Sequence, residues 1–267
     1  MHDLTDQEFT RFQRFIFDAA GITLSPSKKA LVAGRLAKRV QDCGLAGYAA
    51  YFKLLASGER PAEVQTAVDL LTTNETYFFR EPKHFEVLRK SATDRPADGK
   101  PFRVWSAASS TGEEAYSIAM VLEDCLGSGR WEVVGSDIST RVLAQARRGQ
   151  YVASRTTNIP PAYLKRFCLR GVGEHEGTVL VQRQLRSHVR FHQVNLNDAV
   201  PGTFGTFDVV FLRNVLIYFS HETKRQVVAR VLALLKPGGY FFVGHSETLN
   251  GISESVRASG PAIYRRI

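Results

Sequence analysis

A short turn of small side chains, at residues 107–112, is the segment of this chain best suited to hold a ligand. Residues 103–106 predict a buried strand before it, no side chain in the turn is larger than threonine, and a helical pattern begins near Glu113. Such a turn lets a ligand approach the backbone closely, and the first N–H groups of the helix stay free to bind it. Because the turn lacks the GxGxxG spacing of dinucleotide-binding loops, a plain strand–helix connection explains it equally well.

A carboxylate follows the next predicted strand. Residues 131–137 predict a short strand that ends in an acidic residue, Asp137. At the tip of a parallel strand, a carboxylate can accept hydrogen bonds from both hydroxyls of a ribose. Asp137 could instead cap the helix predicted from about Ser139 to Arg148, and a single aspartate does not decide between these roles.

The second half of the chain predicts another strand, a helix and a final strand in close succession. Residues 207–213 are typical of a strand buried on both faces, and Asn214 follows at the carboxyl end, where open α/β sheets bind their ligands. A helix is predicted from about Glu222 to Leu235, then a Lys-Pro-Gly-Gly turn at 236–239 and an aromatic strand at 240–245. This succession resembles the second half of the S-adenosylmethionine-dependent methyltransferases.

Six sequence blocks, in order, make the resemblance more specific. They are TTNETYFFR, VWSAASSTGEEAYSIA, GSDIS, VNL, FLRNVLIYF and LLKPGGYFFVGHSE, spread over residues 72–247. Together they resemble the chemotaxis receptor glutamate methyltransferases, the CheR family. The resemblance implies an α/β fold: a doubly wound, Rossmann-like methyltransferase domain with a small β-subdomain insertion, preceded by an all-helical domain. The chain ends at Ile267, shortly after the last predicted strand, which led us to expect a complete, single-function member.

The activity implied is transfer of the sulfonium methyl of S-adenosylmethionine to a glutamate side chain, which gives a γ-methyl ester. A glutamate with an ordinary pKa of ~4.3 is already ionised at neutral pH, so this reaction needs no general base. The protein must instead remove water from the carboxylate and align its oxygen with the methyl and the sulfur. The absence of an evident Cys, His or Ser nucleophile agrees with direct displacement.

The resemblance also implies roles for individual residues. Arg80 and Tyr218 are expected to steer the substrate carboxylate, although Arg80 could pair with a surface acid and Tyr218 could be a core aromatic. Glu113 is expected to hold the methionine end of the cofactor, with Glu114 as a less certain neighbour, and Asp137 to hold the ribose. The full expected cofactor-binding set is Asn74, Thr76, Arg80, Glu113, Asp137, Asn195, Leu196, Arg213 and Asn214, with Asn195 and Leu196 beside the adenine. His245 and Glu247 are given no role.

The N-terminal residues predict a small helical domain. Thr5 and Glu8 form a capping-box pattern for a helix that ends near Gly21, and Ser25 with Pro26 predicts the start of a second helix ending at Gly44. Two shorter helices are predicted at about 48–57 and 61–71. We expect a helical receptor-recognition domain at 1–75 and a methyltransferase domain at 76–267.

A line of basic residues marks the second predicted helix. Lys28, Arg35 and Arg39 lie within ~20° of one line along it, and Lys38 borders them. Such a line is usually a solvated face, but the resemblance implies that it binds the acidic, glutamate-bearing helices of a chemoreceptor bundle. The sequence does not rank Lys28, Arg35, Lys38 and Arg39 by importance.

Residues 149–188 are more than an ordinary α/β loop needs. Residues 166–170 and 178–183 flank GVGEHEG, which predicts a hairpin within a β-subdomain at about 155–188. In some members of the resembled family, the edge of this subdomain binds a C-terminal receptor peptide by strand addition. A purely structural hairpin fits the residues equally well.

Composition limits the remaining possibilities. No apolar run approaches the ~20 residues of a membrane span, no signal peptide is evident, and Cys43, Cys125 and Cys168 lack metal-ligand spacing. We therefore expect a cytoplasmic, metal-free monomer that reaches the membrane only through its receptors. The net charge of +9 leaves a nucleic-acid methyltransferase as one alternative, although no RNA-binding module is evident and we expect no nucleic-acid partner. A non-catalytic cofactor-binding adaptor is the other, although Arg80, Asn214 and Tyr218 are all present.

Overall fold

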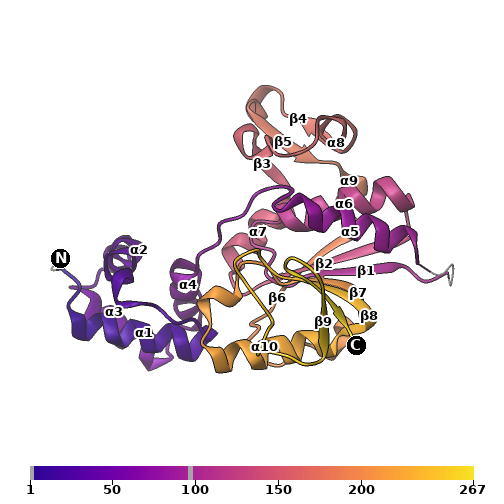
Figure 1. Cartoon of the computed structure of the whole chain (residues 1–267). Helices are drawn as coiled ribbons and strands as arrows, with labels where there is room; N and C mark the ends of the chain where they lie inside the picture. Colours follow the sequence, from indigo (N-terminus) through magenta and orange to yellow (C-terminus); the bar gives the residue numbers. More distant parts are fainter. Residues whose placement is uncertain (1–2, 96–98) are drawn as a thin grey trace.

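The computed structural model describes residues 3–95 and 99–267, which form a helical part followed by an α/β part (Figure 1). The helical part contains α1 (Asp6–Ala20), α2 (Lys29–Asp42), α3 (Tyr48–Ser57) and α4 (Pro61–Leu71). Their apolar faces meet around Phe12, Ile16, Val32, Leu36 and Tyr51, each of which is fully buried. The helical part therefore has a core of its own.

The ends of the first two helices follow from local chemistry. The capping box predicted for α1 is present, because Thr5 and Glu8 bond each other's backbone N–H groups, and Gly21 ends the helix in a left-handed conformation. The second helix starts later than predicted, since Pro26–Lys28 form a 3-10 turn and α2 begins at Lys29. The Ser25 hydroxyl contacts Ser27 instead of capping a helix.

A seven-stranded sheet forms the centre of the α/β part. Its strands are β1 (Phe102–Ser106), β2 (Trp131–Asp137), β6 (Val189–Gln193), β7 (Phe207–Phe211), β8 (Leu235–Phe242), β9 (Val256–Gly260) and β10 (Ile263–Arg266), in the order β6-β2-β1-β7-β8-β10-β9. The first five strands of that order are parallel, β10 runs antiparallel to β8, and β9 runs antiparallel to β10. The chain moves outward from β1 in both directions, so the carboxyl ends of β1, β2 and β7 border the crevice where doubly wound sheets bind ligands.

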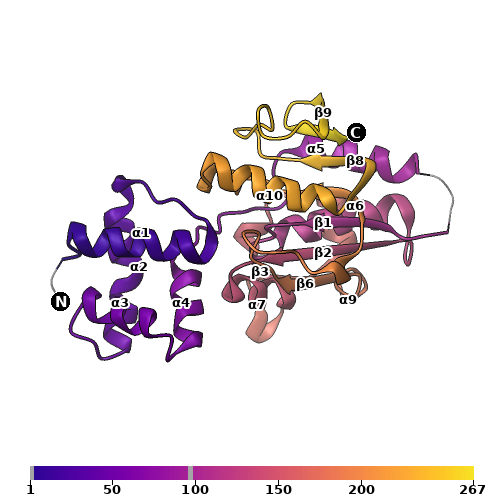
Figure 2. The ribbon, with the colours of Figure 1, turned by 90° about the horizontal axis from the view of Figure 1, so that it is seen from below.

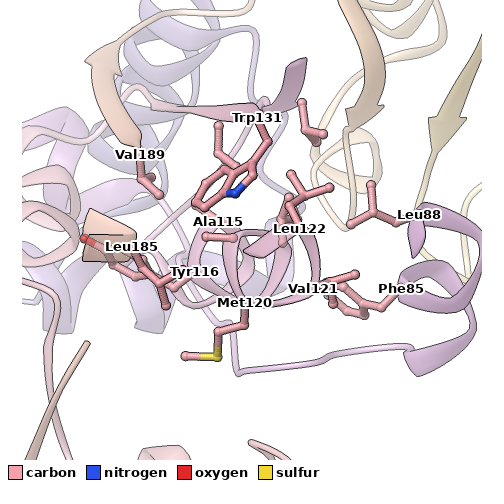
Figure 3. Close-up of a cluster of buried hydrophobic side chains, with 14 of the residues drawn as sticks. Phe85, Leu88, Ala115, Tyr116, Met120, Val121, Leu122, Trp131, Leu185 and Val189 are labelled. Carbon is pink, nitrogen blue, oxygen red and sulfur yellow. The ribbon is translucent and has the colours of Figure 1, made fainter. Parts of the chain in front are cut away.

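Helices cover both faces of this sheet. On one face lie α5 (Pro82–Thr93) and α6 (Glu113–Leu126), and on the other lies α10 (His221–Ala233) (Figures 1 and 2). Figure 3 shows the first core, where Phe85 and Leu88 of α5 and Met120 and Leu122 of α6 gather below Trp131 of β2. Burial on both faces explains why these strands are apolar throughout instead of alternating.

Two details at the end of the sheet differ from the sequence prediction. The Lys-Pro-Gly-Gly segment lies within β8, where Leu235 pairs with Phe207 and Tyr240 with Val209, so that residues 236–239 interrupt the register. Gly238 has a φ of 74°, which a residue with a side chain rarely adopts. The antiparallel strand β9, which pairs with β10, was not predicted.

The insertion carries a second, three-stranded sheet that projects beyond α6 (Figure 1). Its strands β3 (Gln150–Val152), β5 (Thr178–Val181) and β4 (Cys168–Arg170) are antiparallel, and two short helices, α8 (Pro161–Phe167) and α9 (Arg183–Arg186), accompany them. Because β3 starts at Gln150, this sheet begins before the predicted limit of 155. Strand β4 lies at its edge and exposes Leu169.

The basic residues of α2 do not form a uniform surface. Arg39 ion-pairs with the buried carboxylate of Glu63, which also accepts a hydrogen bond of 2.7 Å from the Tyr51 hydroxyl. The hydrogen bonds from Arg39 hold the pKa of Glu63 below its ordinary value. Arg35 donates to the carbonyls of Leu71 and Thr72 at 3.0 and 3.1 Å. Lys28 and Lys38 are exposed, whereas Arg35 and Arg39 already have partners within the protein.

This difference predicts effects of different size on stability for two neighbouring cations. Arg39→Ala should lower the free energy of unfolding by about 1–3 kcal/mol, because Glu63 would stay buried without its charged partner. Lys38→Ala should change it by less than about 0.5 kcal/mol, since its side chain is exposed. Urea unfolding of both variants measures this, and equal stabilities would contradict a structural role for Arg39.

None of the helices in the described parts of the chain combines the length and the apolarity needed to cross a lipid bilayer.

Candidate functional site

A cavity of about 430 Å³ lies between the carboxyl ends of the central strands and the helical part. The helical part contributes Lys28 and Arg35, and the segment that joins the two parts contributes Asn74, Thr76 and Arg80. The predicted residues that line it are Lys28, Arg35, Asn74, Thr76, Arg80, Asp137, Asn195, Leu196, Arg213, Asn214 and Tyr218. Glu113, Lys38 and Arg39 are not among its lining residues. The fold thus brings together residues from Lys28 to Tyr218.

The turn of small residues forms one wall of this cavity. Ala107, Ala108 and Ser110 line it, and the Ala107 and Ser109 amides hold the turn to the neighbouring strands β7 and β2, each through a hydrogen bond of 2.8 Å. Gly112 has a φ of 95°, and a Cβ there would lie 2.9 Å from the Cβ of Ala146. Glycine at this position therefore allows α6 to begin directly against α7 (Thr140–Arg148).

Asp137 lies at the tip of β2, as predicted, and both of its carboxylate oxygens accept hydrogen bonds from backbone N–H groups. One carboxylate oxygen accepts the Ser110 N–H at 2.9 Å, and the other accepts the Ser139 N–H at 3.0 Å. Ser139 itself caps α7, so Asp137 is not the helix cap. Burial raises the pKa of Asp137 to about 6, against the opposing effect of these hydrogen bonds. Each oxygen retains a lone pair with which to accept a ligand hydroxyl.

The two glutamates at the start of α6 have different surroundings, which corrects the prediction for Glu113. The Glu113 carboxylate is buried, ion-pairs with Arg155 at 2.5 Å and accepts the Thr111 hydroxyl at 2.6 Å. Glu114 lines the cavity and accepts the Ser106 hydroxyl at 2.7 Å. Consecutive helical residues point about 100° apart, so only one of the pair can face the ligand. Glu114 is the carboxylate that can meet a cationic group.

Two arginines of the cavity differ in their partners. Arg213 is buried, lies 3.5 Å from the carboxylates of both Glu81 and Glu114, and donates to the Arg80 carbonyl at 2.5 Å. The Arg80 guanidinium makes no ion pair with any residue that the structure describes, and it lies 5.5 Å from the ring centre of Tyr77. The Arg80 guanidinium also donates to the Glu75 carbonyl at 3.4 Å, a neutral partner that leaves its charge unmatched, whereas the charge of Arg213 is already matched.

Asn195 lines the cavity and also makes structural hydrogen bonds that the sequence did not predict. Its side-chain amide donates to the Ala19 carbonyl of α1 and to the Asp198 carboxylate, both at 2.9 Å. The bond to Ala19 joins the helical part to the loop after β6. Leu196 and Val194 are nearly buried beside it and give this end of the cavity apolar surface suited to a flat ring.

Glu247, to which the sequence gave no role, holds the loop that carries Arg213, Asn214 and Tyr218. Its carboxylate accepts N–H groups from Gly244 at 2.6 Å, Asn214 at 2.7 Å and Ile217 at 3.3 Å. Asn214 has a φ of 57°, and a Cβ on Gly244 would overlap its amide. In the sequence, the GHSE block was the only sign that Glu247 matters. Glu247 follows Asn214, whose loop it supports, by 33 residues.

Comparison with known proteins agrees with this site. Residues 74–264 match the CheR methyltransferase SAM-binding domain, and residues 7–72 match the CheR methyltransferase all-alpha domain. The chemotaxis protein methyltransferases of Salmonella typhimurium and Escherichia coli are each 42% identical over 98% of this chain, covering 90% and 91% of those proteins. Chemotaxis protein methyltransferase 2 of Pseudomonas aeruginosa is 42% identical over 97% of this chain and 93% of its own length. The chain is a member of the CheR family of S-adenosylmethionine-dependent methyltransferases.

Proposed function

We propose that this enzyme methylates glutamate side chains of chemoreceptors to γ-methyl esters. The observation that carries the proposal is the Arg80 guanidinium, which lines the cavity without an ion-pair partner among the described residues. An unmatched cation that lines a cavity suits an anionic acceptor better than a neutral hydroxyl or amine.

The cavity residues fit S-adenosylmethionine in their donor chemistry. Asp137 can accept the ribose hydroxyls, and Glu114 can accept the ammonium of the methionine end. Leu196, Val194 and Ile138 offer apolar surface to the adenine. The bound cofactor supplies a sulfonium methyl, and the remaining work of the protein is to place the acceptor.

The acceptor needs orientation and dehydration instead of deprotonation. None of the described residues that line the cavity is a histidine or a cysteine, which agrees with a substrate that is already ionised. Arg80 would bind the carboxylate while the Tyr218 hydroxyl, which has no hydrogen-bond partner among the described residues, would donate to its second oxygen. Negative and positive charge cancel during the transfer, so a dry site favours the reaction.

Two surfaces are suited to the receptor. The exposed Lys28 and Lys38 of the helical domain, residues 1–75, would attract acidic receptor helices and orient them toward the cavity. The edge strand β4 exposes Leu169 at 52%, Val172 just beyond it is exposed at 78%, and this edge could add a C-terminal receptor peptide as a further strand. We propose that the enzyme acts as a cytoplasmic monomer and reaches the membrane only through these receptors.

Labelled methyl donor and receptor-containing membranes test the substrate class. We expect incorporation into receptor protein, with label that is released by mild base because a carboxyl ester hydrolyses readily. Receptors whose modified glutamates are replaced by alanine provide the matched control and should accept no label. Base-stable label, or label transferred to RNA under the same conditions, would contradict the proposal.

Glu247 gives a further prediction for this reaction. Glu247→Gln places an amide NH₂ against the backbone N–H groups of Asn214, Gly244 or Ile217, which shifts the loop that carries Tyr218. We expect single-turnover methyl transfer to slow by about 10–100-fold. Hydrogen exchange at the Asn214 and Ile217 amides should accelerate in the same variant. Exposed Glu254, replaced in the same way, is the control; equal rates in the two variants would rule out the positioning role.

A further inference from the structure

Two histidines and a glutamate meet where the start of α5 faces the loop after β8. Glu81 precedes α5, His84 lies in its first turn, and His245 follows β8. One potential ligand atom from each residue lies within 4.8 Å of the other two. The Glu81 Oε2 is 3.4 Å from Nδ1 of His84 and 3.7 Å from Nε2 of His245.

The atoms in the centre of this cluster lack hydrogen-bond partners among the described residues. His84 is fully buried, its ring stacks on Phe242, and neither ring nitrogen makes a hydrogen bond of ordinary geometry to a described residue, although the Pro261 carbonyl lies close by. The Glu81 Oε2 is buried and accepts no hydrogen bond from the described residues, although it lies 3.5 Å from Arg213, whereas its Oε1 accepts the His245 N–H at 3.1 Å. Buried polar atoms without partners are costly, so their convergence on one point indicates a ligand that would satisfy them.

The donor types and spacing suit a divalent metal ion. Tetrahedral zinc binds imidazole nitrogen and carboxylate oxygen at about 2.0–2.2 Å, which separates its ligands by about 3.3–3.6 Å. The observed separations of 3.4 and 3.7 Å from Glu81 Oε2 need little adjustment.

The neighbouring Arg213 sets a condition on this site. The Arg213 guanidinium lies 3.5 Å from Glu81 Oε2 and would repel a bound cation. Glu114 lies equally close to this guanidinium and can hold it when Glu81 binds the metal. His245 is 55% exposed and provides a path of entry from solvent. We propose that Glu81, His84 and His245 bind one zinc-class divalent cation, leaving a fourth coordination position open to water.

Zinc titration of the full-length protein, stripped with a chelator and free of methyl donor, tests this proposal. We expect one zinc per chain, measured by competition with a chromogenic chelator. Binding should weaken by at least about tenfold in His245→Ala, which removes one ligand with little effect on the core. His221→Ala changes an exposed histidine at the start of α10 and should bind zinc like the unaltered protein.

A second measurement identifies the ligands without altering the buried His84. Cobalt(II) in the same site should give the visible bands of a nitrogen and oxygen ligand set, without the sulfur charge-transfer bands that Cys43, Cys125 or Cys168 would cause. The proposal is overturned by an absence of zinc binding, by equal affinity in His245→Ala, or by sulfur bands. These measurements do not depend on whether the receptor is the substrate, because they follow metal binding and not methyl transfer.

Discussion

Replacing Arg80 with alanine should slow the methyl-transfer step by about 10²–10³-fold, the range seen when one preorganised charged donor is lost from an active site. Arg80 lines the cavity and lacks an ion-pair partner among the described residues, so its charge is available to an anionic acceptor. Arg213 cannot do so, because Glu81 and Glu114 already match its charge. Single-turnover kinetics with saturating methyl donor measure the step directly.

Two comparisons separate this role from others. Arg80→Lys keeps the charge but loses the planar guanidinium that binds a carboxylate with two hydrogen bonds. Its rate of methyl transfer should therefore fall between the rates of the unaltered protein and of Arg80→Ala. Binding of S-adenosylhomocysteine, measured by calorimetry, should change much less than the rate in both variants. A rate in Arg80→Ala equal to that of the unaltered protein would exclude Arg80 from steering the acceptor.

Asp137→Asn should weaken S-adenosylhomocysteine by about 10–100-fold, because a ribose hydroxyl would lose a charged acceptor. The substitution keeps the size of the side chain. However, the NH₂ group of the asparagine would face the N–H group of either Ser110 or Ser139, and two donors cannot form a hydrogen bond. Calorimetry at pH 7.5 measures the loss. Asp208→Asn changes a carboxylate that pairs with Lys236 away from the cavity, and it should bind the product normally. Unchanged affinity in a folded Asp137→Asn would remove Asp137 from the site.

The pKa of Asp137 adds a pH dependence with a definite sign. Because burial raises this pKa from 3.8 to about 6, acidification protonates the carboxylate that should accept the ribose. Affinity should therefore fall by about tenfold per pH unit below 6, and this step should be absent in Asp137→Asn. For folding the sign is opposite: the stabilisation from protonated Asp137 is fully present below pH 3.8 and is lost as the pH rises through about 6. The folded protein therefore keeps an ionised carboxylate at a cost in stability, which is typical of a binding residue.

The sequence by itself determined the features that depend on neighbours along the chain. The Thr5–Glu8 capping box, the small turn at 107–112 and the apolar strands were readable because helix ends, tight turns and buried strands impose local requirements on residue type. Asp137 was also identified from its place after a strand. The six ordered sequence blocks predicted membership of the CheR family, and the matches at 7–72 and 74–264 confirm it.

Only the tertiary structure decided which partner each charged or polar side chain has. Glu114 faces the cavity in place of Glu113 because Arg155, 42 residues further along, holds Glu113 inside the protein. Arg39 pairs with Glu63, and Asn195 joins α1 to the loop after β6, although both residues seemed suited to ligands from the sequence. Glu81 and His245 lie 164 residues apart in the chain and are in contact in the fold. Such pairings depend on how packed elements face one another, and a local residue pattern carries no record of that geometry.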